Sequence, residues 1–284
     1  MSILKFENVS KGFGEGTAHT EVLKNIDLEV KEGEFLVLLG FSGSGKTTLI
    51  NLMAGLEMPT KGQVTFKGKP IAGPGPERGV IFQSYSLMPW LTVTGNVRLA
   101  VDTVFPKLSA AEKADKVAHY VKMVGLSHAA SRRPAELSGG MRQRVNVARA
   151  LAMNPEVLLL DEPLSALDPF LRIRMRAELK RLQRELGITF LHVTHGQDEA
   201  LALADEIVVL SSGEIVERGR HAKLLEADGV YAGMWKRQQA EKEKQAAAVE
   251  RAKEEVSLPE LKVPDMPKFS MPAIPKLEVP NDGY

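Results

Sequence analysis

The sequence GFSGSGKTTL, residues 40–49, follows the apolar run FLVLL at 35–39 and opens a helical pattern, TTLINLMAG. Gly40, Gly45, Lys46 and Thr47 satisfy G-x-x-x-x-G-K-[ST] between a predicted strand and a predicted helix, the context of a phosphate-binding loop. Glycines let successive backbone N–H groups turn inward around phosphates, and the helix amino terminus adds its dipole. Lys46 is expected to neutralise the β- and γ-phosphates, and the Thr47 hydroxyl to ligate Mg²⁺.

Two acidic residues follow a second apolar run, VLLL at 157–160. A carboxylate that ends a parallel strand emerges at the carboxyl edge of the sheet, beside such a loop. We therefore expect Asp161 to serve Mg²⁺ and Glu162 to position or polarise the attacking water. The alternative is that both carboxylates only cap the next helix. His195, which ends ITFLHVTH, is predicted to contact the γ-phosphate.

The other histidines and glycine clusters lack comparable patterns. No pair of histidines has metal-ligand spacing, so the rest are expected to be structural: His19, His119, His128, His192 and His221. The glycine clusters at 12–16 and 73–79 lack a strand before and a helix after them, so we expect loops.

The hydrophobic pattern predicts an α/β fold. Runs that are apolar on both faces suit buried parallel strands: 35–39, 157–160 and 188–194. β-formers at 3–8, 22–30 and 63–67 suggest an antiparallel sheet near the start, and 206–219 reads as a hairpin. Residues 90–135 have helical character, and 170–186 repeat apolar residues at steps of three and four, with Arg and Glu on the solvated face.

The composition is that of a globular protein, with 44% hydrophobic and 26% charged residues in 284. Lys and Arg total 37 against 36 Asp and Glu, so no net field attracts nucleic acid or anionic lipid. There is no cysteine, which excludes disulfides and thiolate metal sites. We find neither a secretory signal pattern nor an apolar run of about 18 residues, so we expect a soluble protein whose membrane role comes through a partner.

The composition changes twice near the carboxyl end. Residues 236–256 are rich in Ala, Glu, Lys and Gln, which suits a charged solvated helix or a frayed linker. Residues 257–284 contain three proline octads, PELKVPDM, PKFSMPAI and PKLEVPND, which forbid a helix and favour extended chain. We expect a disordered Pro-rich tail; the alternative is a segment that docks on a partner groove.

A second glycine-rich helix start lies in LSGGMRQRVNVARAL, 137–151. Ser138, Gly139 and Gly140 would form a second anion-binding helix terminus, although a plain capped helix is the alternative. With the phosphate loop and VLLLDEP in order around it, the sequence resembles the nucleotide-binding subunits of ABC transporters through residues 1 to about 225.

The resemblance implies an α/β P-loop NTPase of ABC type within residues 1–235. Such a domain has a mixed central sheet, an antiparallel β subdomain and a helical subdomain, here at about 90–150. In that family the phosphate loop of one subunit and the LSGG motif of another close on the same ATP, head to tail, through a contact loop that matches SALD at 165–168.

The resemblance also assigns roles to residues. Gln83, in VIFQ, matches the Q-loop glutamine, which joins Glu162 and His195 as a catalytic group and Thr47 and Asp161 at Mg²⁺. The matched ATP-binding residues are Phe13, Gly40, Phe41, Ser42, Gly43, Ser44, Gly45, Lys46, Thr47, Thr48, Ser138, Gly139 and Gly140. Two positions depart from the family: Phe41 stands where proline or a small residue is frequent, and Gly196 where aspartate is common.

The segment 74–106 resembles the nitrate, sulfonate and taurine branch of importers, and its LAVDTVFP end favours nitrate or a related anion. The resemblance thus implies a translocase ATPase on the cytoplasmic face of the cell membrane. Its partners would be a second ABC ATPase subunit, a membrane-spanning permease and, indirectly, a periplasmic or lipid-anchored binding protein.

The permease is expected to dock on an apolar surface of Tyr85, Leu87, Met88, Pro89 and Trp90, unless these residues only pack the helical insertion on the core. Two alternative functions remain: a taurine or alkylsulfonate importer, and a soluble ABC ATPase not tied to transport. Near-neutral charge gives the second no nucleic-acid footprint.

Overall fold

The computed structural model describes residues 1–14, 16, 19–84, 86–165 and 167–255. The chain divides into two compact units, Met1–Gln238 and Gln239–Tyr284. Tyr85, Ala166 and the proline octads of 257–284 lie outside the described residues, so predictions about them stay predictions, as do the domain boundaries at 235 and 256.

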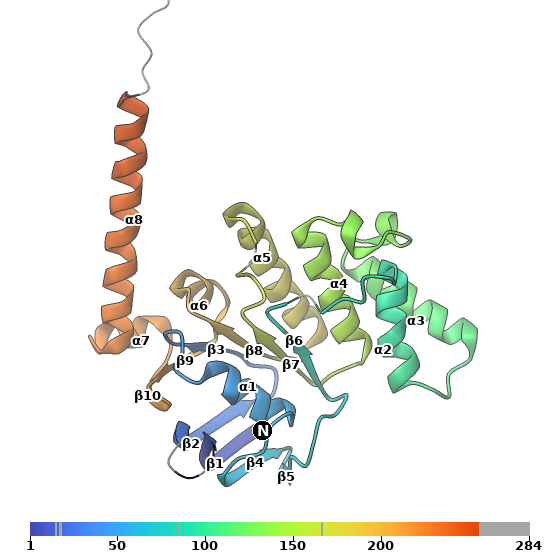
Figure 1. Cartoon of the computed structure of the whole chain (residues 1–284), viewed down its shortest axis with the longest axis horizontal. Coiled ribbons are helices and arrows are strands. Elements are labelled where there is room, and N and C mark those ends of the chain that lie inside the picture. Colours follow the sequence, from blue (N-terminus) through green and yellow to red (C-terminus); the bar gives the residue numbers. More distant parts are fainter. Residues whose placement is uncertain (15, 17–18, 85, 166, 256–284) are drawn as a thin grey trace, which may run out of the picture. The chain divides into compact units, whose positions relative to one another are not determined.

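A six-stranded mixed sheet forms the centre of the first unit (Figure 1). Its order is β10-β9-β3-β8-β7-β6, with all neighbours parallel except the β9–β10 hairpin. The bounds are β3 Phe35–Leu39, β6 Arg78–Ile81, β7 Val157–Asp161, β8 Thr189–Thr194, β9 Glu206–Ser211 and β10 Glu214–Gly219. Every residue of β3, β7 and β8 is buried and these strands pair in parallel, which confirms the prediction for them. The antiparallel pairing of β9 with β10 confirms the predicted hairpin.

Two features of this sheet were not predicted. β6 begins at Arg78, within the cluster expected to be a loop, and its sequence RGVI has too little apolar length to signal a strand. β9 was predicted only as half of a hairpin, yet it also pairs in parallel with β3, Leu36 opposite Glu206. The hydrophobic pattern carries no information on which strand lies beside which.

A four-stranded antiparallel sheet in the order β2-β1-β4-β5 lies near the start of the chain, as predicted. Its strands are β1 Ser2–Phe13, β2 Thr20–Lys31, β4 Lys61–Phe66 and β5 Lys69–Pro70. β1 runs beyond the predicted segment because register shifts, one of them between Phe6 and Val9, carry the pairing past Asn8, which has φ 50°.

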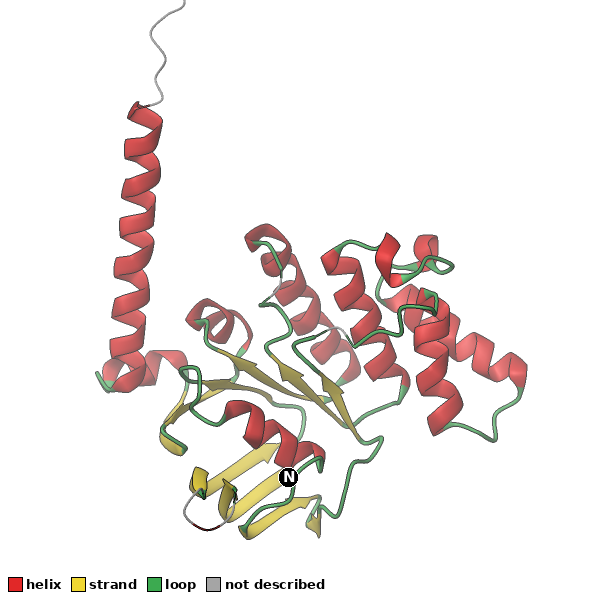
Figure 2. Cartoon of the chain, in the orientation of Figure 1, coloured by secondary structure: helices red, strands yellow, loops and turns green. Residues whose placement is uncertain are grey.

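One helix, α1 Lys46–Ala54, lies between the two sheets (Figure 2). It packs its apolar residues against one face of the central sheet and the inner face of the antiparallel sheet. Alternate residues of β3 point to opposite sides: Leu36 and Leu38 join this layer, whereas Val37 and Leu39 join the cluster on the other face.

Helices cover that other face (Figure 1). They are α2 Val93–Val104, α3 Ala110–Met123, α4 Gly139–Ala152, α5 Pro169–Leu186 and α6 Gln197–Leu203, with 3₁₀ turns at Ser127–Ala129 and Pro134–Glu136. α2, α3 and α4 form the predicted helical subdomain, and α5 matches the predicted helix at 170–186. Two helices follow β10, α7 His221–Glu226 and α8 Val230–Glu255.

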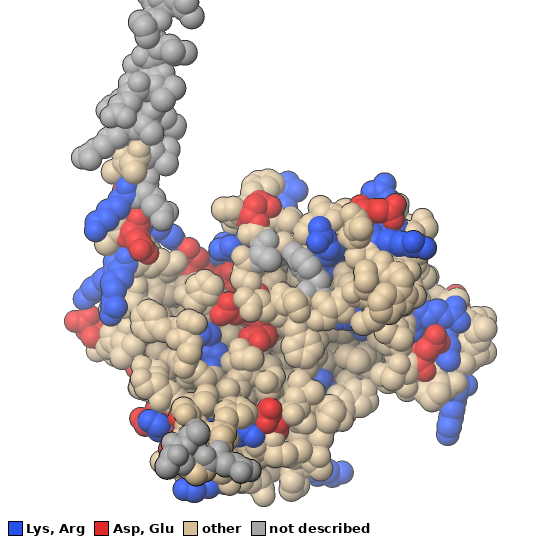
Figure 3. Space-filling view, in the orientation of Figure 1, with Lys and Arg blue, Asp and Glu red and all other residues tan. Residues whose placement is uncertain are grey.

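The surface and the helices agree with the bulk composition. Lys and Arg are interspersed with Asp and Glu on the face drawn in Figure 3, as a net charge of +1 leads one to expect. Of the helices in the described ranges, none combines the length and apolar character that a membrane span requires.

Candidate functional site

The phosphate loop joins β3 to α1, and glycine geometry shapes it. Gly43 has φ 78° and Gly45, the N-cap of α1, has φ 99°, both in the left-handed region that favours glycine. A Cβ on Gly40 would lie 2.4 Å from the Leu210 carbonyl oxygen of β9, so this glycine allows close backbone approach. The buried Ser44 Oγ has no hydrogen-bond partner, which leaves a polar atom able to meet an anion.

Lys46 is only 5% exposed, although it carries a charge. Its Nζ donates to the carbonyl oxygens of Gly40 and Phe41, each at 2.9 Å, so it lies folded under the loop. Burial lowers the pKa of this ammonium, and the negative charges of Glu162 and Asp161 oppose the shift. A cation with so little water around it interacts strongly with an incoming phosphate.

Thr47 and Asp161 meet beside this loop, as predicted. The Thr47 Oγ1 donates to Asp161 Oδ1 at 3.4 Å, joining α1 to the carboxyl end of β7. Asp161 is 8% exposed, and burial raises the pKa of its carboxyl, against the effect of the Thr47 hydrogen bond. Among the described residues no group of three or more acidic or histidine side chains could hold a metal alone. Mg²⁺, however, takes few protein oxygens and completes its shell with water and phosphate, so this pair fits it.

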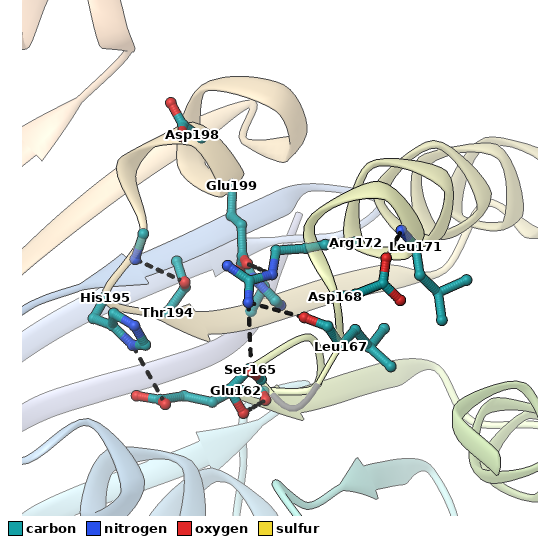
Figure 4. Close-up of polar contacts among 12 residues, drawn as sticks. Glu162, Ser165, Leu167, Asp168, Leu171, Arg172, Thr194, His195, Asp198 and Glu199 are labelled. Atoms are coloured by element: carbon teal, nitrogen blue, oxygen red, sulfur yellow. Dashed lines mark hydrogen bonds and ion pairs between the residues drawn. The ribbon is translucent and has the colours of Figure 1, made fainter. Parts of the chain in front are cut away.

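Glu162 and His195 also come together, from the ends of β7 and β8 (Figure 4). Glu162 Oε2 lies 3.4 Å from His195 Nδ1, and the imidazole is 64% exposed. The Glu162 backbone has φ 45°, an uncommon conformation for a residue with a side chain, and its N–H donates to the Val193 carbonyl at 3.2 Å. Strain of this kind is found at functional sites.

The capping alternative for these two carboxylates is wrong. The N-cap of α5 is Asp168, whose Oδ1 accepts from the Leu171 N–H at 3.0 Å. Two of the remaining histidines are structural, as predicted: His192 is fully buried on Glu199, and His221 contacts the Tyr231 hydroxyl at 2.7 Å.

The LSGG segment forms the start of α4, as predicted. Ser138 caps the helix by accepting from the Met141 N–H at 3.3 Å. A Cβ on Gly140 would lie 2.5 Å from the Leu171 side chain, so this glycine packs α4 on α5. None of the hydrogen bonds or ion pairs of the described residues joins Ser138, Gly139 or Gly140 to the phosphate loop of the same chain.

Three predicted site residues make no described contact with Lys46, Thr47, Asp161 or Glu162. Gln83 lies two residues after the end of β6 and is exposed. Among the described hydrogen bonds, none joins its side chain to Thr47 or Asp161. Phe13 ends β1, and the Lys11 ammonium lies 4.8 Å from its ring centroid. Phe41 is 53% exposed on the loop, with the Arg237 guanidinium 5.9 Å from its ring centroid.

The apolar surface near the helical subdomain is partly as expected. Trp90 is 67% exposed, whereas Leu87 packs against the core. The fully buried Asn96 side chain holds the loop before α2, accepting from the Met88 N–H and donating to the carbonyls of Met88, Leu91 and Thr92. Trp90 therefore projects from a loop of fixed shape.

Sequence reasoning missed two charged residues beside the Glu162 and His195 pair. Arg172 of α5 and Glu199 of α6 lie between the segments that carry these side chains (Figure 4). Arg172 falls in a helix whose Arg and Glu residues were assigned to solvent, so the pattern hid it. The signal available was its position, four residues after the end of the predicted contact loop at 165–168.

A sequence model described as ABC transporter matches residues 23–165, about half of the chain. Over 208 residues, 73% of this chain, it is 50% identical to the bicarbonate transport ATP-binding protein CmpC of Synechococcus elongatus. It is 44% identical to the nitrate transport protein NasD of Klebsiella oxytoca over 74% of this chain and 81% of that protein. It is 51% identical to the nitrate import ATP-binding protein NrtC of Synechocystis over 67% of this chain.

Coverage of these relatives differs. The matched part amounts to 31% of CmpC and 28% of NrtC, so the chain spans less than a third of these two proteins. Among solved structures, the dimeric bacterial ABC transporter cassette MJ0796 has a TM-score of 0.69 at 34% identity, covering 77% of this chain and 98% of that one. CbiO1 from Clostridium perfringens, part of the ABC transporter complex cbiONQ, has a TM-score of 0.72 at 30% identity, covering 79% and 91%.

Asp161→Asn should stabilise the protein in the absence of nucleotide. Because burial raises the pKa of this carboxyl in the folded state, ionising it costs folding free energy, and stability falls as pH rises through that window. We expect the variant to have a higher melting temperature than wild type at pH 8, and we expect this difference to narrow as the pH is lowered toward the ordinary pKa of an aspartate carboxyl. The exposed Asp115→Asn is the matched control and should leave the melting temperature unchanged. A lower melting temperature for Asp161→Asn at pH 8 would show instead that the carboxylate is stabilised by Lys46.

Proposed function

The chain belongs to the ABC transporter family of ATP-binding proteins, and we propose on this basis that it hydrolyses ATP to drive import of a small anion, with nitrate as the first candidate. The observation that carries the proposal is the convergence of a buried lysine, a Thr–Asp pair and a Glu–His pair on the carboxyl edge of β3, β7 and β8. Such an edge is where nucleotides bind in sheets of this kind.

Each of the site residues would have a separate role in phosphoryl transfer. The loop N–H groups and Lys46 would bind the β- and γ-phosphates, and Thr47 and Asp161 would hold Mg²⁺, which supplies further positive charge to the phosphates. Glu162 would accept a hydrogen bond from the attacking water and take its proton as the oxygen bonds to the γ-phosphorus, while the bond from that phosphorus to the bridging oxygen breaks and ADP leaves. His195, with its Nδ1 3.4 Å from Glu162 Oε2, orients that carboxylate.

We propose that a second ATPase subunit completes the site. The cap formed by Ser138, Gly139 and Gly140 is an amino-terminal anion site, and no described contact joins it to the phosphate loop of its own chain. A head-to-tail pair would bring each cap to the loop of the facing subunit. The MJ0796 cassette, 34% identical to this chain, is dimeric, which supports association of two such subunits.

The exposed Trp90 supports a second contact, with a membrane-spanning permease. A large aromatic side chain on a fixed loop is the usual anchor of a protein interface. Since the described helices include no membrane span, the chain would lie at the cytoplasmic face of the membrane through this partner, with an external binding protein engaged only indirectly.

The substrate class follows from the relatives, not from this site. NasD and NrtC are named for nitrate and CmpC for bicarbonate, and both ions are small planar oxyanions. The match covers 81% of the nitrate protein NasD, against 31% of CmpC and 28% of NrtC, so we propose nitrate first.

Glu162→Gln should lower the turnover number for ATP by about 10²–10⁴-fold, because the amide cannot accept the proton of water. ATP binding should persist, and the ATP-bound pair should accumulate. Phosphate release and light scattering with ATP measure the two effects. The exposed Glu185→Gln, on α5, is the control and should hydrolyse ATP like wild type. Unchanged turnover in Glu162→Gln would remove this residue from its proposed role.

Trp90→Ala should reduce anion uptake by cells about tenfold or more, because losing an interface anchor weakens docking. ATP hydrolysis by the purified chain should stay within about twofold of wild type, since the side chain is 67% exposed and far from Lys46 in sequence. Val216→Ala, an exposed apolar change on β10 at the opposite edge of the sheet from β6, is the control. If Trp90→Ala fails to fold, the residue packs the insertion and is not a docking anchor.

Cells that lack this chain should lose growth on nitrate as sole nitrogen source, and wild-type chain but not Glu162→Gln should restore it. Growth on taurine as sole sulfur source and growth limited by external bicarbonate are the parallel measurements. Loss confined to taurine would contradict the nitrate proposal in favour of sulfonates, and loss confined to bicarbonate would assign the other planar anion.

A further inference from the structure

Arg172 holds the turn that follows Glu162. It lies in the first turn of α5, and its Nη2 donates to the carbonyl oxygens of Leu167 at 3.1 Å and Ser165 at 3.4 Å. Ser165 in turn donates through Oγ to the Glu162 carbonyl at 2.9 Å and through its N–H to the same oxygen at 3.2 Å. A single guanidinium thus reaches the backbone on which the Glu162 carboxylate is carried.

The same guanidinium faces α6, which begins two residues after His195. Arg172 Nε lies 4.0 Å from Glu199 Oε1 and is buried without a hydrogen-bond partner of its own. Glu199 is anchored on the other side, because its Oε2 lies 2.9 Å from Nε2 of the fully buried His192 on β8. The distance between Arg172 Nε and Glu199 Oε1 exceeds that of a charge-assisted hydrogen bond by about 1 Å.

Both members of this pair are charged at neutral pH. Burial alone would raise the pKa of Glu199, but its hydrogen bonds with His192 and Thr194 and the positive charge of Arg172 hold that pKa below the ordinary value. A guanidinium does not lose its proton in proteins. The contact is therefore an ion pair that is only partly screened by water, since the Glu199 side chain is 9% exposed.

The backbone around His195 is fixed from the same side. The Gly196 N–H donates to Thr194 Oγ1 at 2.9 Å, and Gly196 is the N-cap residue of α6. In Figure 4 the Arg172 side chain lies between the Ser165 and Leu167 carbonyls on one side and Glu199 on the other, with Glu162 and His195 facing each other at the ends of these two segments.

We propose that Arg172 and Glu199 are a positioning pair for ATP hydrolysis: they couple the turn at Glu162–Asp168 to the segment His195–Glu199 and so keep the Glu162 carboxylate aligned with His195 and the attacking water. Neither side chain touches the reacting atoms. The inference rests on the proposed function, because it concerns the step in which Glu162 acts as base.

The experiment compares Arg172→Met, Arg172→Lys, Glu199→Gln and the double variant Arg172→Met/Glu199→Gln in full-length protein. Misplacing a catalytic group by about 1 Å can cost about 10²-fold in rate. We expect Arg172→Met and Glu199→Gln each to lower kcat for ATP about 10- to 100-fold with KM within about twofold. The double variant should lose no more than the worse single change, and Arg172→Lys should recover part of kcat. Arg184→Met, an exposed arginine on the same helix, is the control and should match wild type.

Rates are referred to the folded fraction measured by thermal melting in the same buffer. A purely structural role predicts lower melting temperatures with kcat per folded molecule unchanged, and that result overturns the inference, as does full additivity of the two single changes. If Arg172→Met does not fold, Glu199→Gln alone decides, since it removes the charge and keeps the shape. Wild-type protein that does not hydrolyse ATP overturns the proposed function itself, whereas active wild type with unaffected variants overturns only the positioning pair.

Discussion

Burial of opposite charges at the carboxyl edge of the central sheet is the constraint on which the site depends. Lys46 and Asp161 are 5% and 8% exposed, respectively. Burial lowers the pKa of the lysine and raises the pKa of the aspartate, so it favours the neutral form of each side chain. Such an arrangement costs stability in the free protein, and the proposed phosphate and Mg²⁺ would bring compensating charge to it. The apolar strands β3, β7 and β8 make this possible, because they exclude water from beneath the loop while ending at a common edge.

The chain carries two glycine-rich helix starts that could bind anions. α1 and α4 both begin with glycines, but the first opens at a strand end inside the sheet edge and the second at the top of a helical layer packed on α5 through Gly140. Two such termini that do not meet within a chain can act on one ligand only if two chains supply them. Packing on α5 accounts for Gly140, whereas the proposed facing subunit would give the start of α4 a ligand.

Local patterns predicted most of this, and tertiary relations account for what they missed. The phosphate loop, Asp161, Glu162 and the buried strands follow from contiguous residues whose spacing carries the signal, so they were predictable. β6 was missed because RGVI is short and interrupted by Arg78 and Gly79, and the β9 register depends on contacts across the sheet. Arg172 was hidden because a helical arginine satisfies the amphipathic pattern equally well in solvent or against a turn carbonyl.

The alignment of Glu162 with His195 depends on the turns that follow their strands. Glu162 and His195 end adjacent strands, β7 and β8, and so their separation is set by strand register and by the two turns that follow. The strands are fully buried and cannot slide independently, whereas the turns are held by a few polar contacts, including the 4.0 Å ion pair. Any movement that alters the alignment of Glu162 with His195 must therefore occur in the turns after β7 and β8.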